Sequence, residues 1–551
     1  MKIEIVYKDK SGNVKSYNSG NTVKEFNLEI LSDSEYRLHI NIVPNEKLEL
    51  LTAKAVLSGI YGDTDTVFCN GYQAWTVSKE YGAGDVQRGL SWLTRMKPIR
   101  KLAAVTGDYL FADYTYKKGD FHSYSYTYVK NKEGTLNFYG SINENNGFTV
   151  FYYSKRNDYF ILSKDVEGLV TDKPFELFNV VRYEGTYDEV FDNYFDAYRR
   201  EAGNGFNKPR LKGLSGYTSW YNYFQKIDEG IILRDLKGLE RAGKAANIFQ
   251  IDDGYEAFVG DFLDVNAEKF PRGMKFIADE IHARGFLAGI WLAPFVAERK
   301  SRVFNEHPDW FIKDKKGEPV VSVPAWSHAS TLNFNIPECR EYIVKMLKNA
   351  VDNWGYDMLK LDFLYAVCMN PRDGKTRGML MREAMELIRE AVGEKPYILG
   401  CGVPLASAFG IVDACRISCD VDLQFKFRPL SGIINNEIPC TPNAINNTIF
   451  RRHLSGRTFA NDPDVFFLRD NNLSFTSEQK LMLAKINNMF GDILFVSDNV
   501  GDYSGDKVEL LKDFLTKKDI RIISCDNTEN GNIAVKYQLG GKEFSETFTL
   551  N

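Results

Sequence analysis

The strongest constraint on the fold of this 551-residue chain is a regular alternation of short apolar segments with longer amphipathic ones from about residue 213 onward. The short segments are continuous apolar runs of strand length, and the longer ones repeat apolar residues at helical spacing. Eight strands joined by helical crossovers predict a (β/α)8 barrel, with a doubly wound parallel sheet as the competing fold. The predicted strands are 213–220, 246–252, 287–293, 357–363, 397–401, 414–420, 465–469 and 493–497. The predicted helices are 228–242, 274–283, 337–353, 377–392, 477–488 and 507–517.

The sequence on either side of this alternation is typical of antiparallel sheets. Up to about residue 200, short alternating segments such as 2–7, 36–43, 122–130, 148–153 and 159–163 are separated by clusters of Gly, Asn and Asp, which predicts a β-sandwich. Residues 204–212, with Gly205 and Pro209, have the composition of a linker. After residue 518 the alternation returns around Asn530-Gly531 and Gly540-Gly541, which are hairpin turn signals. We therefore expect an N-terminal β-sandwich at 1–205, a barrel at 206–518 and a small C-terminal antiparallel β-sheet at 519–551.

Composition and charge argue against several classes of partner. Lys plus Arg is 69 and Asp plus Glu is 74, so the net charge of −5 provides no basic footprint for a nucleic acid. The longest nearly apolar run, 285–297, is too short to cross a bilayer. The N-terminal stretch MKIEIVYKDK has no apolar core of a signal peptide, so we expect a cytoplasmic protein. A monomer and a homo-oligomer both remain open.

Motifs for metals and cofactors are missing from the sequence. The 8 Cys have no CxxC spacing and the 6 His no HExxH pattern, which favours free thiols and no metal site. A GxGxxG turn after a strand and a GxxxxGK[ST] loop are also absent. We therefore expect no cofactor.

Acidic residues end several of the predicted barrel strands. They are Asp252 and Asp253, Asp362, Asp420 and Asp498. Catalytic side chains of a barrel lie at the carboxyl ends of its strands, and carboxylates that converge there without His partners suggest glycoside hydrolysis. The same acids could instead hold a divalent metal, as in enolase-like barrels, or cap the helices that follow.

Aromatic residues near these strand ends favour a sugar as the ligand. Trp220 and Tyr221 follow the first strand, Trp291 lies in the third, and Trp75 comes from the predicted sandwich. A sugar site needs apolar walls and a few placed polar groups. Each aromatic, taken alone, could simply fill the core.

A set of co-linear blocks resembles glycoside hydrolase family 36, the bacterial α-galactosidases of the melibiase type. The blocks are GYTSWYNYF from Gly216, FQIDDGYEAFVGDF from Phe249, KFP from Lys269, GIWLAPF from Gly289, FNEHPDWFIK from Phe304, KLDFLYA from Lys360, and the stretch 398–420. NGYQAW from Asn70 is similar to a further element of that family. The blocks cover most of residues 213–420, which makes the resemblance far more specific than any lone motif.

The resemblance implies a role for each matching position. Asp362 corresponds to the nucleophile and Asp420 to the acid/base of a retaining exo-α-galactosidase. Asp252 and Asp253 would hold the 4- and 6-hydroxyls of galactose, and Lys360 and Arg416 further ring hydroxyls. Trp75, Trp220, Tyr221, Trp291 and Cys401 would line the sugar subsite. The implied substrates are melibiose- or raffinose-type oligosaccharides.

The residues themselves support part of this assignment. Lys360 and Asp362 are two apart on a strand and share a face, and a nearby cation lowers the pKa of a carboxyl, which suits a nucleophile. Asp252 and Asp253 are adjacent, so both reach one sugar only if the strand ends there, and Gly254 permits that turn.

Departures from the family pattern concern the leaving-group side of the site and not the chemistry. Tyr217 and Thr218 stand where the family usually has Trp and Cys, and Phe425 where a relative might place Trp. These substitutions do not define which aglycone the enzyme prefers. The alternatives are an α-N-acetylgalactosaminidase, a galactosyl-transferring enzyme similar to raffinose synthase, and a non-catalytic sugar-binding relative.

Overall fold

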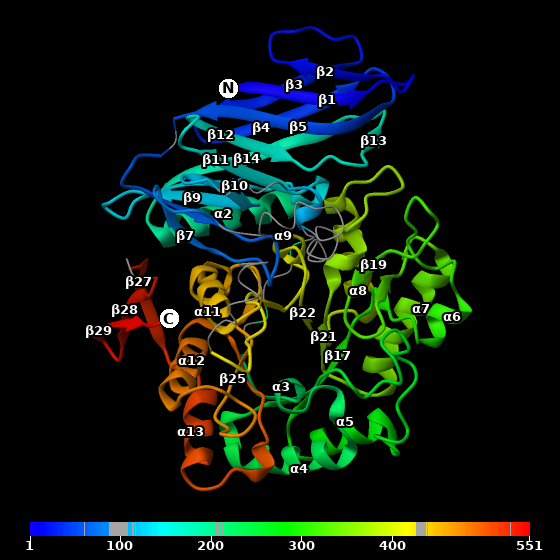
Figure 1. The fold of residues 1–551 in the computed structure, drawn as a ribbon, viewed down its shortest axis with the longest axis vertical. Coiled ribbons are helices and arrows are strands. Elements are labelled where there is room, and N and C mark those ends of the chain that lie inside the picture. Colours follow the sequence, from blue (N-terminus) through cyan, green and yellow to red (C-terminus); the bar gives the residue numbers. More distant parts are fainter. Residues whose placement is uncertain are drawn as a thin grey trace.

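The structure is a computed structural model, shown in Figure 1. It describes residues 1–59, 61–87, 108–112, 115, 117–203, 206, 210, 213–425, 437, 439–528 and 531–550. Most of the predicted linker 204–212, with the boundary predicted after residue 205, lies outside these residues, as does Asn530.

The N-terminal part is a sandwich of two antiparallel sheets, as predicted, drawn in blue and cyan at the top of Figure 1. Side chains of its strands alternate between the core and the surface: Ile3, Ile5 and Tyr7 are buried and their neighbours are not. One sheet has the order β2 (Val14–Asn18), β1 (Lys2–Lys8), β5 (Leu48–Ser58), β12 (Tyr159–Lys164), β11 (Thr149–Ser154) and β8 (Asp120–Tyr124), with β13 (Val170–Thr171) beside β5. The other has the order β3 (Phe26–Ser34), β4 (Arg37–Pro44), β14 (Phe175–Gly185), β10 (Leu136–Ser141), β9 (Tyr126–Lys130), β6 (Thr66–Cys69) and β7 (Lys79–Gly82).

Two features of the sandwich differ from the prediction. The segment 122–130 is two strands, because Ser125 adopts a φ of 66° and the chain passes there from one sheet to the other. A helix, α2 (Tyr187–Ala202), packs on the second sheet, with the Tyr194 ring 5.1 Å from the Phe138 ring. Its signal in the sequence was the capping box of Thr186 and Glu189, followed by aromatic residues at helical spacing.

The central part is a barrel of parallel strands, which confirms the predicted fold class. Its hydrogen-bonded order is β24 (Ala460–Asp462), β23 (Ala414–Arg416), β22 (Tyr397–Gly400), β21 (Met358–Leu361), β17 (Leu287–Leu292), β16 (Ile248–Ile251), β15 (Leu214–Thr218), β26 (Ile493–Val496) and β25 (Val465–Phe466). The main crossover helices are α4 (Glu229–Leu239), α5 (Gly273–Ala283), α7 (Pro337–Lys348), α8 (Arg377–Val392), α11 (Thr441–Phe450), α12 (Ser477–Phe490) and α13 (Asp506–Leu515).

The seventh barrel strand is split in two. The prediction at 465–469 captured only β25, which pairs with β26, whereas β24 pairs with β23 on the other side. Pro463 cannot donate a ladder hydrogen bond, and Asp464 has a left-handed φ of 73°. The kinked segment that contains β24 and β25 therefore joins β23 to β26 and closes the barrel.

Several predicted strands end earlier than expected. The fourth ends at Leu361 and the sixth at Arg416. Asp362 and Asp420 therefore stand in the loops just beyond their strands, at the mouth of the barrel. A small sheet of β18 (Val296–Ala297), β20 (Ala329–Thr331) and β19 (Val321–Val323) follows the third barrel strand.

The C-terminal sheet, red in Figure 1, is antiparallel as predicted and consists of β27 (Ile520–Asn527), β28 (Ile533–Leu539) and β29 (Lys542–Phe548). It contacts both other parts: Asp526 forms an ion pair with Lys130 of β9, and Glu546 with Lys485 of α12. Within the described ranges, the helices are all too short or too polar to cross a membrane.

Candidate active site

The first pair of predicted site residues forms a buried ion pair across the barrel. Asp252 follows β16, and its Oδ2 lies 2.7 Å from the Nζ of Lys360 on β21. Gln250 donates to the same oxygen at 3.0 Å. Burial alone would lower the pKa of Lys360, but the carboxylates of Asp252 and Asp362 outweigh it and raise that pKa. Lys360 therefore stays charged.

Asp362 lies beside this pair, surrounded by neutral donors. Its Oδ2 accepts from the Trp291 indole at 3.2 Å, and its Oδ1 from the Phe363 amide at 2.8 Å. The thiol of Cys401 is a further hydrogen-bonding partner. Phe363 itself has a left-handed φ of 54°, so the chain turns directly after Asp362.

Lys360 lowers the pKa of Asp362, as expected, but the net shift of that pKa is upward. Burial raises the pKa of Asp362, the charge of Asp420 raises it further, and Lys360 only partly opposes them. The physical reason is that the ammonium of Lys360 is committed to Asp252.

Arg416 joins three further residues at the mouth. Its Nη2 lies 2.7 Å from Asp420 Oδ1 and also 2.7 Å from Asp464 Oδ2. Tyr221 donates to Asp464 and lies 3.3 Å from the same guanidinium nitrogen. Arg416 and Asp464 are buried, whereas the Asp420 side chain is 42% exposed. Asp420 is thus the acid of this group that faces the solvent side.

Asp253 has partners of its own. Its carboxylate accepts from Gln225 at 3.0 Å and from the Trp326 indole at 3.1 Å. Gly254, with a φ of 122°, makes the turn that the sequence suggested, and a Cβ there would lie 2.8 Å from Gln225. Asp252 and Asp253 therefore diverge to different donors at the end of one strand.

Glu256 completes this acidic cluster. Burial, and then the charge of Asp253, raise the pKa of Glu256 well above its usual range. Burial also raises the pKa of Asp253. Burial thus favours the protonated form of Glu256, which can donate the hydrogen bond that joins it to Asp253.

Aromatic rings wall the site. Trp75 reaches the mouth from the sandwich, with its ring 5.4 Å from Phe363. It fits because Gly402 has no side chain: a Cβ there would come within 2.6 Å of the Trp75 ring. Trp291 and Trp326 are 6.1 Å apart, and Trp220 lies half-buried against Phe224 at 5.2 Å.

The structure thus brings the predicted residues to one barrel mouth, with one exception. Asp498 is fully buried in an ion pair with Arg469 and accepts from two backbone amides, so it stabilises the fold. The prediction missed Gln225, Glu256, Trp326 and Asp464. Asp464 precedes the predicted seventh strand instead of following it, and Trp326 lies in the hairpin between β19 and β20, where no strand-end rule applies.

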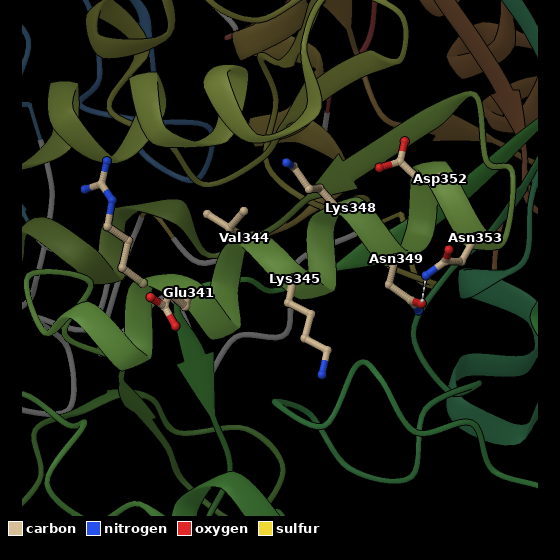
Figure 2. A pocket seen from close by; sticks show the side chains of 8 residues that line it. Glu341, Val344, Lys345, Lys348, Asn349, Asp352 and Asn353 are labelled. Carbon is tan, nitrogen blue, oxygen red and sulfur yellow. Dashed lines mark hydrogen bonds between the residues drawn. The ribbon is translucent and has the colours of Figure 1, made fainter.

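Two other possible kinds of site were considered. Within the described ranges, no group of three or more His, Cys, Asp or Glu residues is placed to hold a metal ion. A surface hollow of about 470 Å³ runs along α7 and the turn 349–353, and Figure 2 shows that its lining side chains belong to this one helical stretch. It contains none of the residues of the barrel mouth.

Two carboxylic acids, a buried lysine, a buried arginine and aromatic walls at a barrel mouth make up the composition of a glycoside hydrolase site. Residues 235–384 match the Melibiase family model. This match confirms the resemblance of the motifs to the melibiase family over that stretch of the barrel.

Solved structures show the same fold over nearly the whole chain. The α-galactosidase TtGalA from Thermus thermophilus has a TM-score of 0.72 at 23% identity, over 94% of this chain and 96% of that one. The family 36 α-galactosidase AgaA from Geobacillus stearothermophilus has a TM-score of 0.62 at 11% identity, over 97% and 80%.

Sequence relatives match over shorter stretches. An Escherichia coli α-galactosidase is 31% identical over 121 residues, which is 21% of this chain and 16% of that protein. An "A type blood alpha-D-galactosamine galactosaminidase" from Flavonifractor plautii is 29% identical over 166 residues, 28% and 15% of the two chains. The matched stretches span about a sixth of these relatives' own length.

Proposed function

We propose that the chain is a retaining exo-α-galactosidase that hydrolyses terminal α-galactosyl residues of melibiose- and raffinose-type oligosaccharides. The observation that carries this proposal is the meeting of Asp362 and Asp420 at one barrel mouth, each held by different partners. They are close enough for the charge of Asp420 to raise the pKa of Asp362. Two carboxylic acids in distinct surroundings are what double displacement needs.

In the first step, an oxygen of Asp362 attacks the anomeric carbon as the bond to the leaving group breaks. Asp420 gives its proton to the departing oxygen, so a neutral alcohol leaves and a galactosyl ester remains. The charge of Asp362 disappears in this ester, so Asp420, now a carboxylate beside Arg416, can take a proton from water. Water then attacks the same carbon and frees Asp362.

The sugar would be held by the pair of Asp252 and Lys360 and by Asp253. The 4- and 6-hydroxyls of galactose can bond to two carboxylates that diverge from one strand end, and the Trp75 and Trp291 rings supply apolar walls. The Thermus enzyme was solved with p-nitrophenyl α-D-galactopyranoside and with stachyose, and a variant of AgaA with raffinose. These neighbours support an α-galactoside as the substrate class.

A second candidate is an α-N-acetylgalactosaminidase, because the Flavonifractor relative carries that kind of name. The two sugars differ at carbon 2, where an acetamido group replaces a hydroxyl. A panel of aryl α- and β-glycosides of galactose, N-acetylgalactosamine, glucose and arabinose separates the candidates. We expect the α-galactoside to be cleaved fastest, and faster turnover of another sugar would refute the assignment.

The retaining mechanism has its own test. Two successive inversions at the anomeric carbon release α-galactose first, and proton NMR during early hydrolysis detects it before mutarotation. The corresponding separation of the two carboxyl groups is about 5–5.5 Å, against about 6.5–9.5 Å in inverting enzymes. If β-galactose appears first, Asp362 is not the nucleophile.

A further inference from the structure

The Trp75 wall belongs to a loop that leaves the sandwich for the barrel mouth. This loop, residues 70–78, joins β6, which ends at Cys69, to β7, which begins at Lys79. Trp75 is only 8% exposed, and it belongs to the buried cluster that contains the barrel core. Backbone groups of such a buried loop need partners from outside it.

Helix α11 of the barrel provides these partners through two buried side chains. Arg451, the residue that ends this helix, donates from Nη2 to the carbonyls of Gln73 and Thr76, both at 2.9 Å. Asn447, four residues earlier, donates to the carbonyl of Ala74 at 2.9 Å and accepts from the amide of Ser78 at 2.7 Å. Residues four apart share a helix face. The two side chains thus hold the backbone on both sides of Trp75.

The same guanidinium also reaches the catalytic end of the barrel. Its Nη1 donates to the carbonyl of Ile417, the first residue after β23. Ile417 lies between Arg416 and Asp420 in the chain. One buried side chain therefore ties the Trp75 loop to the segment that carries Asp420.

The loop packs tightly against Arg451 at Gly71, where there is no space for a side chain. A Cβ on Gly71 would lie 2.5 Å from the Thr76 carbonyl oxygen and 2.7 Å from Arg451 Nη2. Burial lowers the pKa of Arg451 to about 10, which still leaves it charged at neutral pH. Carbonyl oxygens offset part of the cost of burying this charge.

We propose that Asn447 and Arg451 are positioning residues, which fasten the 70–78 loop so that Trp75 closes the sugar subsite. This inference rests on the proposed function, since it makes Trp75 part of the site for the glycone. The alternative is that the two residues serve only to stabilise the contact between sandwich and barrel.

A double-mutant cycle separates these two roles. We expect Arg451→Met to lower kcat/KM on p-nitrophenyl α-galactoside by about tenfold or more, mainly through KM, because a displaced wall misplaces the sugar. In a Trp75→Ala background the same change should cost less than about twofold, because residues that act through one another are not additive. Equal losses in both backgrounds would overturn the proposal.

Arg452→Met is the matched control. This neighbouring arginine lies 4.0 Å from the Tyr187 ring and donates to the Ile449 carbonyl, away from the loop. Its replacement should leave KM unchanged. Arg451→Lys, which keeps the charge and some donors, should recover part of the affinity.

Hydrogen exchange provides a test without a substrate. In Arg451→Met, the amides of residues 70–78 should exchange about tenfold faster, while those of β6 and β7 keep their rates. If this variant does not fold, Gly71→Ala serves instead, because it crowds the same contact from the loop side. Unchanged exchange in a folded variant would overturn the proposal. If the wild-type protein cleaves no α-galactoside, the proposed function fails while the exchange result still decides whether the loop is fastened.

Discussion

At the scale of single residues, the two aspartates of the proposed reaction differ in their surroundings. Asp362 is 9% exposed and is surrounded by the Trp291 indole, the Cys401 thiol and a backbone amide. Asp420 has an exposed side chain paired with Arg416. Neutral donors fix the direction of a nucleophile, whereas a solvent-facing acid can reach the leaving group and then water.

Replacing Asp362 by Gly should abolish turnover, by at least about a thousandfold, because no covalent intermediate can form. Sodium azide should restore cleavage of an activated aryl galactoside, since it fits the space of the lost carboxyl. The product should be β-galactosyl azide, identified by NMR. Activity that survives without azide would show that another group attacks the sugar.

For Asp420→Ala we expect a loss that depends on the leaving group. A good aryl leaving group departs without a proton, so kcat/KM should fall much less on p-nitrophenyl α-galactoside than on melibiose. Steady-state kinetics on both substrates measures the difference. Equal losses would rule out Asp420 as the general acid.

Asp464 should make the stability of the protein depend on pH. Burial raises its pKa from 3.8 to about 7 in the folded chain, so the folded state binds this proton more tightly than the unfolded state. Stability therefore falls as pH rises from about 4 to about 7, by up to about 4 kcal/mol for a shift of about three pKa units. Asp464→Asn should make the decline smaller by this amount, while other buried acids of raised pKa still contribute. Urea unfolding of both proteins at pH 4.5 and 7.5 measures it.

Asp470→Asn is the control for that experiment. Hydrogen bonds from Lys480 and Lys507 lower the pKa of Asp470 to about 2, so it stays ionised throughout this range. Its replacement should leave the pH dependence as in the wild type. A decline as large in Asp464→Asn as in the wild type would show that Asp464 does not contribute to it.

At the scale of elements, the helix caps show which helices are tied to the sandwich. Thr376 begins α8, accepting from the Met379 amide, and its hydroxyl also donates to the Asn146 carbonyl of the sandwich at 2.8 Å. Thr476 begins α12 with a capping box that is exposed. The first cap therefore joins two parts of the molecule, and the second serves one helix.

Thr376→Ala should lower the free energy of unfolding by about 2 kcal/mol, because it removes a cap and leaves a half-buried carbonyl without this partner. Thr476→Ala, the matched control, should cost about 1 kcal/mol. Urea titration of both variants gives the two values. Equal costs would mean that the bond to Asn146 contributes nothing.

At the scale of the whole molecule, the site is assembled by two parts of the chain. The barrel supplies the acids, the lysine and the arginine, and the sandwich supplies Trp75 over Phe363. The positive charge at the mouth comes from Lys360 and Arg416, which form the ion pairs of the site.

Because these two side chains supply fixed positive charge, we expect no metal requirement. Prolonged dialysis against EDTA should leave kcat and KM on an α-galactoside unchanged, relative to dialysis in buffer alone. Activity that is lost and returns with Mg²⁺ or Mn²⁺ would favour the enolase-like alternative.

The barrel, the two antiparallel parts and most site residues could be read directly from the sequence. Buried parallel strands are continuous apolar runs, and the acids after them lie next to them in the chain, so local pattern suffices. The predicted positions of Asp252 and Asp362 at one mouth follow from this rule, whereas Lys360 and Arg416 were expected from the family resemblance.

Other features depend on segments far apart in the chain, and local pattern does not contain them. The split seventh strand, the raised pKa of Glu256 and the ion pair of Lys360 with Asp252 arise from packing and burial. Burial also reverses the expected pKa shift of Asp362. The free energy of a charge depends on the surrounding dielectric and on the nearest partners, and both exist only once the chain has folded.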